Sequence, residues 1–265
     1  MSLALLDVGA VRPTVVARAN PVAKLAVATV LSLVLLLTVD PVTAGTALAL
    51  ELLVLPWCGL SARALARRLS LVLVGAVPTA VVTAWLGPDS GALVLGAGPL
   101  TVTTGSLESA AAIGLRILAV AVPGVVLLAT TDPTDLGDAL AQVLRLPPRF
   151  VLAAVAAFRL LEVLVQEWVQ LGLARRARGL GDDGLVGGAR RFAGQVFALL
   201  VLAVRRATVL ATAMEARGFG AGERTWARPS RMRPGDWAVV LGGCLIAAAA
   251  TAAGVAAGTW RLLLG

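Results

Sequence analysis

The segment Ser109–Thr130 reads SAAAIGLRILAVAVPGVVLLAT, and its only charged residue is Arg116. A bilayer core of roughly 30 Å requires about 20 mostly apolar residues as an α-helix, because every backbone amide must be satisfied within the segment. This segment is long enough and apolar enough to cross a membrane as a single helix.

Four other segments meet or approach this length, and hydrophobic residues make up 58% of the 265-residue chain. One of them, Val42–Cys58, is short and contains Glu51. A composition rich in Leu, Val, Ala and Gly is typical of helical membrane proteins. We therefore predict an all-α, polytopic membrane protein with about five transmembrane helices, which are the segment above together with Val22–Val39, Val42–Cys58, Leu69–Leu86 and Trp237–Thr259.

Several classes of function are disfavoured by residues that the sequence lacks. It contains no histidine, the commonest zinc ligand and general base, and its two cysteines, Cys58 and Cys244, lie far apart. Lys24 is the only lysine and belongs to no phosphate-binding loop, so the chain is not expected to be an ATPase. The net charge is +8, but aromatic residues make up only 4%, which disfavours nucleic-acid binding.

The positions of the basic residues orient the predicted helices, because cytosolic loops retain positive charge. The loop after the second helix holds Arg63, Arg67 and Arg68, whereas residues 87–108 hold no lysine or arginine. Residues 131–236 hold fifteen arginines. The N-terminus is therefore expected in the cytosol and the C-terminus outside the cytoplasmic membrane. We divide the chain into a membrane region with four helices at 1–130, a cytosolic region at 131–235 and a final transmembrane helix within 236–265.

Three further helices are predicted in the cytosolic region, starting with a short one from about Pro133 to Leu146. The next is expected at Pro148–Arg178, where a polar stripe recurs every three or four residues. The third is expected at Ala189–Arg217, and its apolar part, Phe192–Val204, is only thirteen residues long. We place both long helices along the inner membrane face, since crossing would carry arginines outside.

The two long helices end in the same tripeptide, Ala177-Arg178-Gly179 and Ala216-Arg217-Gly218. A single copy would indicate only a helix C-cap, because glycine readily adopts the left-handed conformation that ends a helix. Two copies on consecutive helices favour a second role, in which each arginine enters an acidic groove of a partner. Glu215 is expected to support Arg217. Arg116 could have a functional role at membrane depth, could pair with Glu51 or Glu108, or could snorkel.

The chain resembles the transmembrane T component of energy-coupling factor transporters, a family that includes membrane subunits of cobalt and biotin importers. The resemblance covers most of the chain. It is carried by the motifs at Asn20–Leu25, Leu115–Leu118, Thr130–Leu136, Ala213–Gly220 and Arg224–Thr225, and by the two Ala-Arg-Gly copies.

This resemblance implies that Arg178 and Arg217 end coupling helices that dock into two ATP-binding-cassette ATPase subunits. It also implies that the chain holds a small substrate-binding membrane protein, the S component, and that ATP is bound by the partners, so that this chain needs no cofactor or metal. Membrane lipid is expected at the arginine pairs, and vitamins or transition metal ions are the expected cargo. The alternative is a membrane enzyme that uses Asp182 and Asp183 on a lipid-linked substrate.

Overall fold

The computed structural model describes residues 14–38, 40–87, 90–97, 100–179, 184–219, 225, 226 and 228–260. Asp182 and Asp183, on which the enzyme alternative depends, lie outside the described residues, as does Arg224 of the resemblance motifs.

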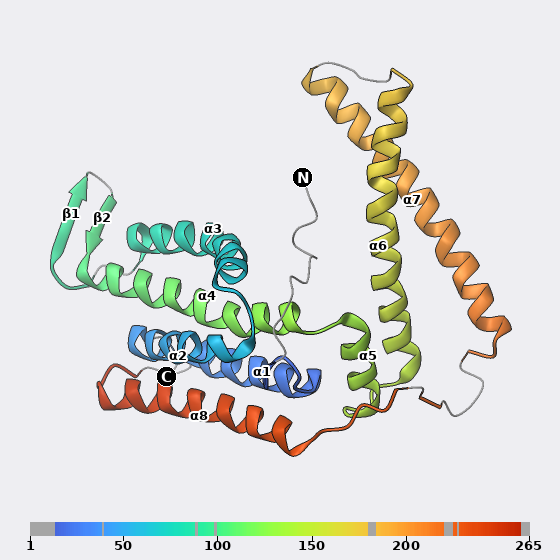
Figure 1. Ribbon diagram of the computed structural model, residues 1–265. Helices are drawn as coiled ribbons and strands as arrows, with labels where there is room; N and C mark the ends of the chain where they lie inside the picture. The colour runs from blue at the N-terminus through green and yellow to red at the C-terminus, as the bar shows by residue number, and fades with distance from the viewer. Residues whose placement is uncertain are drawn as a thin grey trace. The chain divides into compact units, whose positions relative to one another are not determined.

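The structure is almost entirely helical, as predicted (Figure 1). A short 3₁₀ helix follows α2, and one two-stranded hairpin precedes α4. The elements are α1 (Pro21–Leu37), α2 (Pro41–Val54), η1 (Leu55–Cys58), α3 (Ala62–Leu86), β1 (Leu93–Ala97), β2 (Leu100–Thr103), α4 (Thr104–Thr130), α5 (Pro133–Gln142), α6 (Pro148–Ala177), α7 (Leu185–Ala216) and α8 (Pro234–Ala256).

Polar side chains begin the helices of the N-terminal half. Asn20 accepts a hydrogen bond from the Val22 amide at the start of α1, and Asp40 accepts one from the Thr43 amide at the start of α2. Each cap is followed by proline, whose missing N–H is not needed in a first turn. These short polar signals therefore place helix starts between long apolar runs.

The hairpin of β1 and β2 was not predicted, since residues 87–108 were treated as a loop. The strands pair antiparallel with Leu93 opposite Thr103 and Ala97 opposite Leu100. Their β-branched residues favour extended backbone. Thr103 then caps α4 and forms a capping box with Ser106, so that this helix begins five residues before the expected Ser109.

Within the described part of the chain, five helical segments are long and apolar enough to cross a membrane, which supports a multi-pass membrane protein. They are Pro41–Cys58, Arg63–Leu86, Thr104–Thr130, Val186–Ala216 and Pro234–Ala256.

This set of five differs from the prediction at two helices. The helix expected at Ala189–Arg217 was judged too short to cross because its apolar part is only Phe192–Val204. That judgement was wrong, because α7 covers nearly the expected range and its segment Val186–Ala216 is long and apolar enough to cross. Conversely, α1 has 17 residues and is shorter than the expected Val22–Val39. At 1.5 Å per residue it rises about 26 Å.

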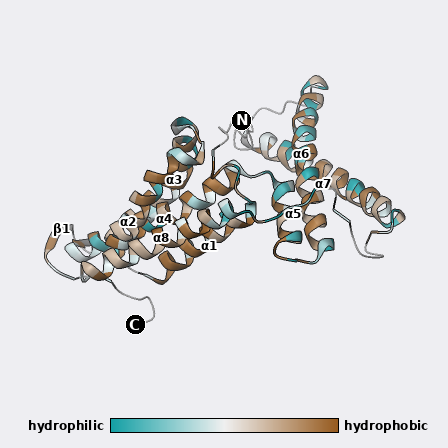
Figure 2. Cartoon of the chain, turned by 60° about the horizontal axis from the view of Figure 1, so that its bottom comes forward, coloured by the Kyte–Doolittle hydropathy of each residue, from teal (hydrophilic) through white to brown (hydrophobic). Residues whose placement is uncertain are grey.

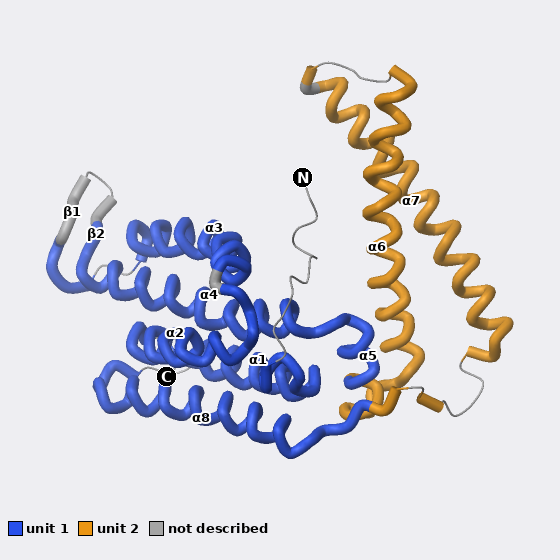
Figure 3. Tube along the Cα trace, in the orientation of Figure 1, with its two compact units in different colours: residues 1–139, 230–265 blue, residues 140–229 orange. Residues whose placement is uncertain are grey.

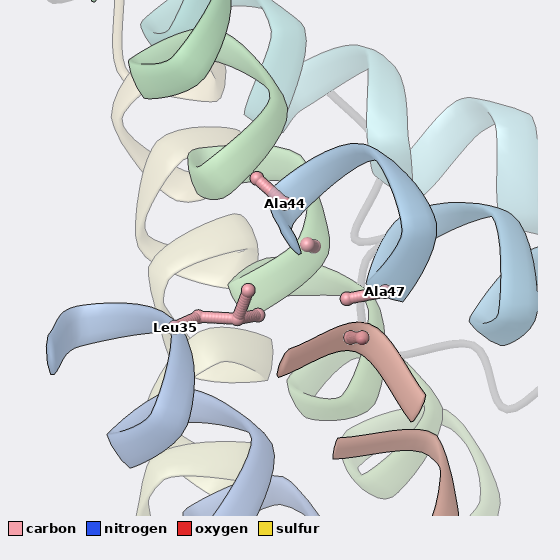
Figure 4. Packing of buried hydrophobic residues seen from close by; sticks show 5 residues of the cluster. Leu35, Ala44 and Ala47 are labelled. Atoms are coloured by element: carbon pink, nitrogen blue, oxygen red, sulfur yellow. The ribbon is translucent and has the colours of Figure 1, made fainter. Parts of the chain in front are cut away.

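Small side chains fill the centre of the packing among α1, α2, α4 and α8. The buried cluster consists of Leu35, Ala44, Ala47, Ala119 and Ala250, so only one of its members is larger than alanine (Figure 4). Small residues allow helix backbones to approach closely, which is the usual way that membrane helices pack.

Many large apolar side chains on α2, α3, α4 and α8, in contrast, are exposed. Leu53, Leu86, Leu128 and Leu245 are among the most exposed, and the helices are coloured mainly as hydrophobic in Figure 2. In water such a surface would be unfavourable, whereas lipid tails would cover it.

The chain divides into two compact units (Figure 3). Unit 1 comprises residues 1–139 and 230–265, and unit 2 comprises residues 140–229, with α6 and α7. Unit 2 is therefore an insertion between two sequence segments of unit 1. The assignment of residues 131–235 to the cytosol stays a prediction.

Candidate partner-docking site

The two Ala-Arg-Gly tripeptides have nearly the same backbone conformation. Arg178, the C-cap of α6, has φ −86° and ψ 7°, and Arg217, the C-cap of α7, has φ −88° and ψ 7°. The glycines that follow have positive φ, 69° at Gly179 and 73° at Gly218. Only glycine adopts this conformation without strain, so the pattern requires it at both positions.

Hydrogen bonds close both helix ends. The Gly179 amide donates to the Arg176 carbonyl at 3.1 Å, and the Gly218 amide donates to the Glu215 carbonyl at 2.9 Å. At the second end, the Phe219 amide also donates to the Met214 carbonyl at 3.0 Å, which completes a Schellman motif. The helix-cap interpretation of the tripeptides is thus confirmed, and it leaves the arginine side chains available for another role.

The side chains of Arg178 and Arg217 are exposed. Within the described residues neither guanidinium group has a hydrogen-bond or ion-pair partner. Glu215 is also exposed and, in the same part of the chain, makes no ion pair with Arg217. The support expected from its carboxylate stays a prediction, while its backbone carbonyl accepts a hydrogen bond that ends α7. We call the ends of α6 and α7 at Arg178 and Arg217 the two tips.

Other arginines of unit 2 have partners and hold α6 and α7 together. Arg175 donates through Nη1 to the Arg191 carbonyl at 2.9 Å, and Arg206 forms an ion pair with Glu167. An exposed ion pair contributes little stability, but its geometry fixes these side chains on the helix pair. The two tip arginines have no such partner among the described residues, which is also true of Arg190, Arg191 and Arg205, so their position at the helix ends is what sets them apart.

The crossing of α6 and α7 is marked by a buried amide. Gln195 is 8% exposed, and its Nε2 donates to the Trp168 carbonyl at 2.7 Å. The Trp168 ring packs edge-to-face on Phe192 with centroids 5.5 Å apart. An aromatic pair of this geometry stabilises a contact by about 1 kcal/mol beyond the area it buries. This contact fixes where α6 and α7 cross, and from there the two helices diverge toward Pro148 of α6 and Ala216 of α7.

A groove of about 1150 Å³ lies between the first half of α6 and the last turns of α7. Its walls are mainly apolar, and it ends at Arg217 and Gly218. Arg149 and Arg159 are the other charged residues that line it. The tip at Arg217 thus stands beside a groove that carries positive charge and no carboxylate.

Arg116 lies on α4 and belongs to unit 1, whereas Arg178 and Arg217 belong to unit 2. It donates to the Thr38 carbonyl just after α1, and the Asp40 carboxylate attracts the same guanidinium group. The structure therefore assigns it to neither Glu51 nor Glu108. Its contacts suit a structural role, because a cation at a helix C-terminus satisfies an orphan carbonyl.

Two polar clusters of unit 1 were not identified from the sequence. One gathers around Asp40, whose Oδ2 accepts a hydrogen bond from Thr259 at 3.0 Å. The other gathers around Asn20 and Lys24, which are 9% and 5% exposed. Asn20 and Lys24 belong to one resemblance motif, but nothing in the sequence identifies their partners.

Comparisons with known proteins agree with the resemblance. A family model described as cobalt transport protein, CbiQ, matches residues 13–226. The energy-coupling factor transporter transmembrane protein EcfT of Heliobacterium modesticaldum is 32% identical over 154 residues, which is 54% of this chain and 58% of that protein. EcfT 1 of Listeria monocytogenes is 30% identical over 152 residues, 54% of this chain and 57% of that protein.

These two matches span less than two thirds of either relative. The protein EcfT of Thermosediminibacter oceani is 28% identical over 246 residues, 88% of this chain and 91% of that protein. Because the family model takes in most of the chain, including both arginine tips, this protein belongs to the CbiQ cobalt transport protein family.

Proposed function

We propose that this chain is the transmembrane coupling subunit, or T component, of an energy-coupling factor importer. It transmits the ATP-driven motion of two ABC-type ATPase subunits to a small membrane protein, the S component, that binds the substrate. The names of three relatives, which are energy-coupling factor transporter transmembrane proteins, support this role. The cargo class is a vitamin or a transition metal ion.

One structural observation carries the proposal. Arg178 and Arg217 stand at helix ends of equal conformation, both side chains exposed and without a partner in the described residues. A guanidinium group forms paired hydrogen bonds with a carboxylate, so each tip suits an acidic groove on an ATPase subunit. When the ATPase subunits close and open, their grooves carry the two helix ends with them.

The topology follows from the same role. The tips reach ATPases only if they face the cytosol, and the fifteen arginines of residues 131–236 favour that side. We place α6 and α7 along the inner face of the cytoplasmic membrane, with the N-terminus inside and the C-terminus outside. In this arrangement the exposed apolar side chains of α7 contact lipid or the S component.

The chain is not catalytic in this proposal, since its partners bind and hydrolyse ATP and it holds no cofactor. A membrane enzyme that acts on a lipid-linked substrate is not proposed. Asp182 and Asp183, its candidate residues, lie outside the described residues, and no contact among the residues that are described favours that reaction.

The test is charge reversal at both tips, Arg178→Glu with Arg217→Glu. Purified in mild detergent, this variant should lose its two ATPase subunits, because a carboxylate would face the acidic groove. The control is Arg190→Glu with Arg191→Glu, which makes the same change of charge at two exposed positions of α7. Retention of both ATPase subunits and of transport by the tip variant would contradict the proposal.

The same purification identifies the cargo. The unchanged complex should contain two nucleotide-binding subunits and one small hydrophobic protein. Any ligand released from the small protein on denaturation names the substrate.

A further inference from the structure

The chain passes between the two units only twice. It leaves unit 1 within α5, between residues 139 and 140, and returns between residues 229 and 230. We call the stretch from Thr130, the last residue of α4, through Thr131 into α5 the outgoing crossover segment, and Ser230–Arg233, which leads to α8, the returning one. Any force between the units that the chain itself carries must pass through these two crossover segments. The residues that hold the segments therefore decide how firmly a movement of unit 2 is transmitted.

Lys24 holds the outgoing segment. Its Nζ donates to the Thr130 carbonyl at 3.1 Å, to Thr130 Oγ1 at 3.0 Å and to the Ala17 carbonyl at 2.9 Å, with Thr131 Oγ1 at 3.4 Å. An ammonium group has three donors, so this one is fully used. It also lies at the C-terminus of α4, where the helix dipole favours positive charge.

Asn20 holds the returning segment. Its side-chain Nδ2 donates to Ser230 Oγ at 3.1 Å and to the Arg231 carbonyl at 3.4 Å. Its backbone amide donates to Asp236 Oδ1 at 2.7 Å, while the other carboxylate oxygen accepts from the Arg233 amide at 2.6 Å. Asp236 is 5% exposed, so these contacts are shielded from water.

Asn20 and Lys24 are four residues apart, and Pro21 begins α1 between them. One residue at this helix start thus binds the segment that leaves unit 1, and the other binds the segment that returns. Farther along the same two segments, Gln142 Nε2 donates to the Arg228 carbonyl at 2.9 Å, which joins them a second time. The crossovers are tied to α1 and to each other.

We propose that Asn20 and Lys24 form an anchor that fixes both crossover segments to α1, so that movement of unit 2 moves the membrane helices with it. These are positioning residues, and the inference rests on the proposed coupling function. Without the anchor, unit 2 stays covalently attached to unit 1, but the two crossover segments are free to change conformation. The ATPase subunits would then move unit 2 without moving unit 1.

The test measures transmission directly, by the distance between spin labels on the two units in the purified complex with its ATPase subunits. One label is placed on the exposed natural Cys244 of α8 and the other on a cysteine introduced by Thr212→Cys on α7, in a Cys58→Ala background. In the unchanged anchor, ATP should shift the label distance. In Lys24→Met the shift should fall at least twofold and the distribution should broaden, because the outgoing segment has lost its holding contacts.

Two further measurements separate the anchor from general damage to the fold. The Lys24→Met complex should keep both ATPase subunits, and its ATP hydrolysis should stay within about twofold of the unchanged complex. Lys24→Arg retains a donor and should restore part of the shift. If the Lys24→Met complex fails to assemble, the label distance is measured in the milder double variant Thr131→Val with Ser230→Ala. This variant removes one hydrogen-bond acceptor from each crossover segment.

The control is Thr259→Val, which removes a hydrogen bond at the opposite end of α8, away from the crossovers. It should keep the full ATP-dependent shift. The anchor is refuted if the crossover variants keep the full shift, if the control loses as much as they do, or if the unchanged complex shows no shift. The tip variants test docking separately: ATPase subunits lost on charge reversal, together with an unaffected shift in Lys24→Met, would refute the anchor alone.

Discussion

Gly254 of α8 lies so close to Asp40 at the start of α2 that a Cβ at position 254 would stand 2.6 Å from Asp40 Oδ2 and would also overlap Thr43 Oγ1. Asp40 is 2% exposed and Thr43 is fully buried, so neither can move into open space. A polar helix start is thus packed directly against the backbone of the last helix. This contact joins the two sequence segments of unit 1.

We predict that Gly254→Ala destabilises unit 1 by about 1–3 kcal/mol, because the added methyl group overlaps buried atoms of α2. The measurement is the midpoint of unfolding in detergent. Gly242→Ala on the same helix is the matched control, since a Cβ there meets nothing within 4 Å. Equal midpoints for the two variants would show that α8 does not approach α2 this closely.

Replacing the glycine after each tip arginine should weaken docking. Gly218→Ala places a Cβ on a residue with φ of 73°, which costs about 1 kcal/mol and frays the last turn that orients Arg217. Less of the ATPase pair should co-purify, and Gly218→Asn should recover part of the loss, because asparagine tolerates this conformation better. Gly188→Ala, on α7 with open space around it, is the control and should bind normally.

Gln195→Leu should loosen the crossing of α6 and α7. It removes a buried donor to the Trp168 carbonyl, and a hydrogen bond of this kind contributes about 1 kcal/mol. Amide hydrogen exchange should accelerate around Trp168 and Phe192. Gln166→Leu, at an exposed position on α6, should leave exchange there unchanged; faster exchange in both variants would contradict a specific role for Gln195.

Glu51→Leu should stabilise the membrane helices by about 1–2 kcal/mol, or leave them unchanged. Glu51 is 5% exposed, and neither carboxylate oxygen has a hydrogen-bond partner among the described residues, so its burial is unfavourable. The check is again the unfolding midpoint in detergent. Glu108→Leu, at an exposed position of α4, should change the midpoint little. A large loss of stability in Glu51→Leu would mean that this carboxyl group makes a favourable contact.

The helix ends were predictable where residues with strong backbone preferences mark them. Pro148 begins α6 as expected, and Gly179 and Gly218 end α6 and α7 within a residue of the expected positions. In contrast, α5 ends at Gln142, before the expected Leu146. Charge was a poorer guide to whether a helix can cross a membrane. Arg205 and Arg206 were taken to bound an apolar segment too short to cross, yet the helix that continues through them, as expected, is long and apolar enough over Val186–Ala216.

The sequence alone determined that this is a helical membrane protein with two arginine-tipped helices, because apolar run length, glycine and proline act locally along the chain. The tertiary structure alone decided which polar residues meet. Asn20 binds Asp236 across 216 positions, and Lys24 binds Thr130 across 106. Such partners depend on how the helices pack, and no local preference of either residue specifies the other. The same reason explains why Arg116 contacts the Thr38 carbonyl rather than a glutamate.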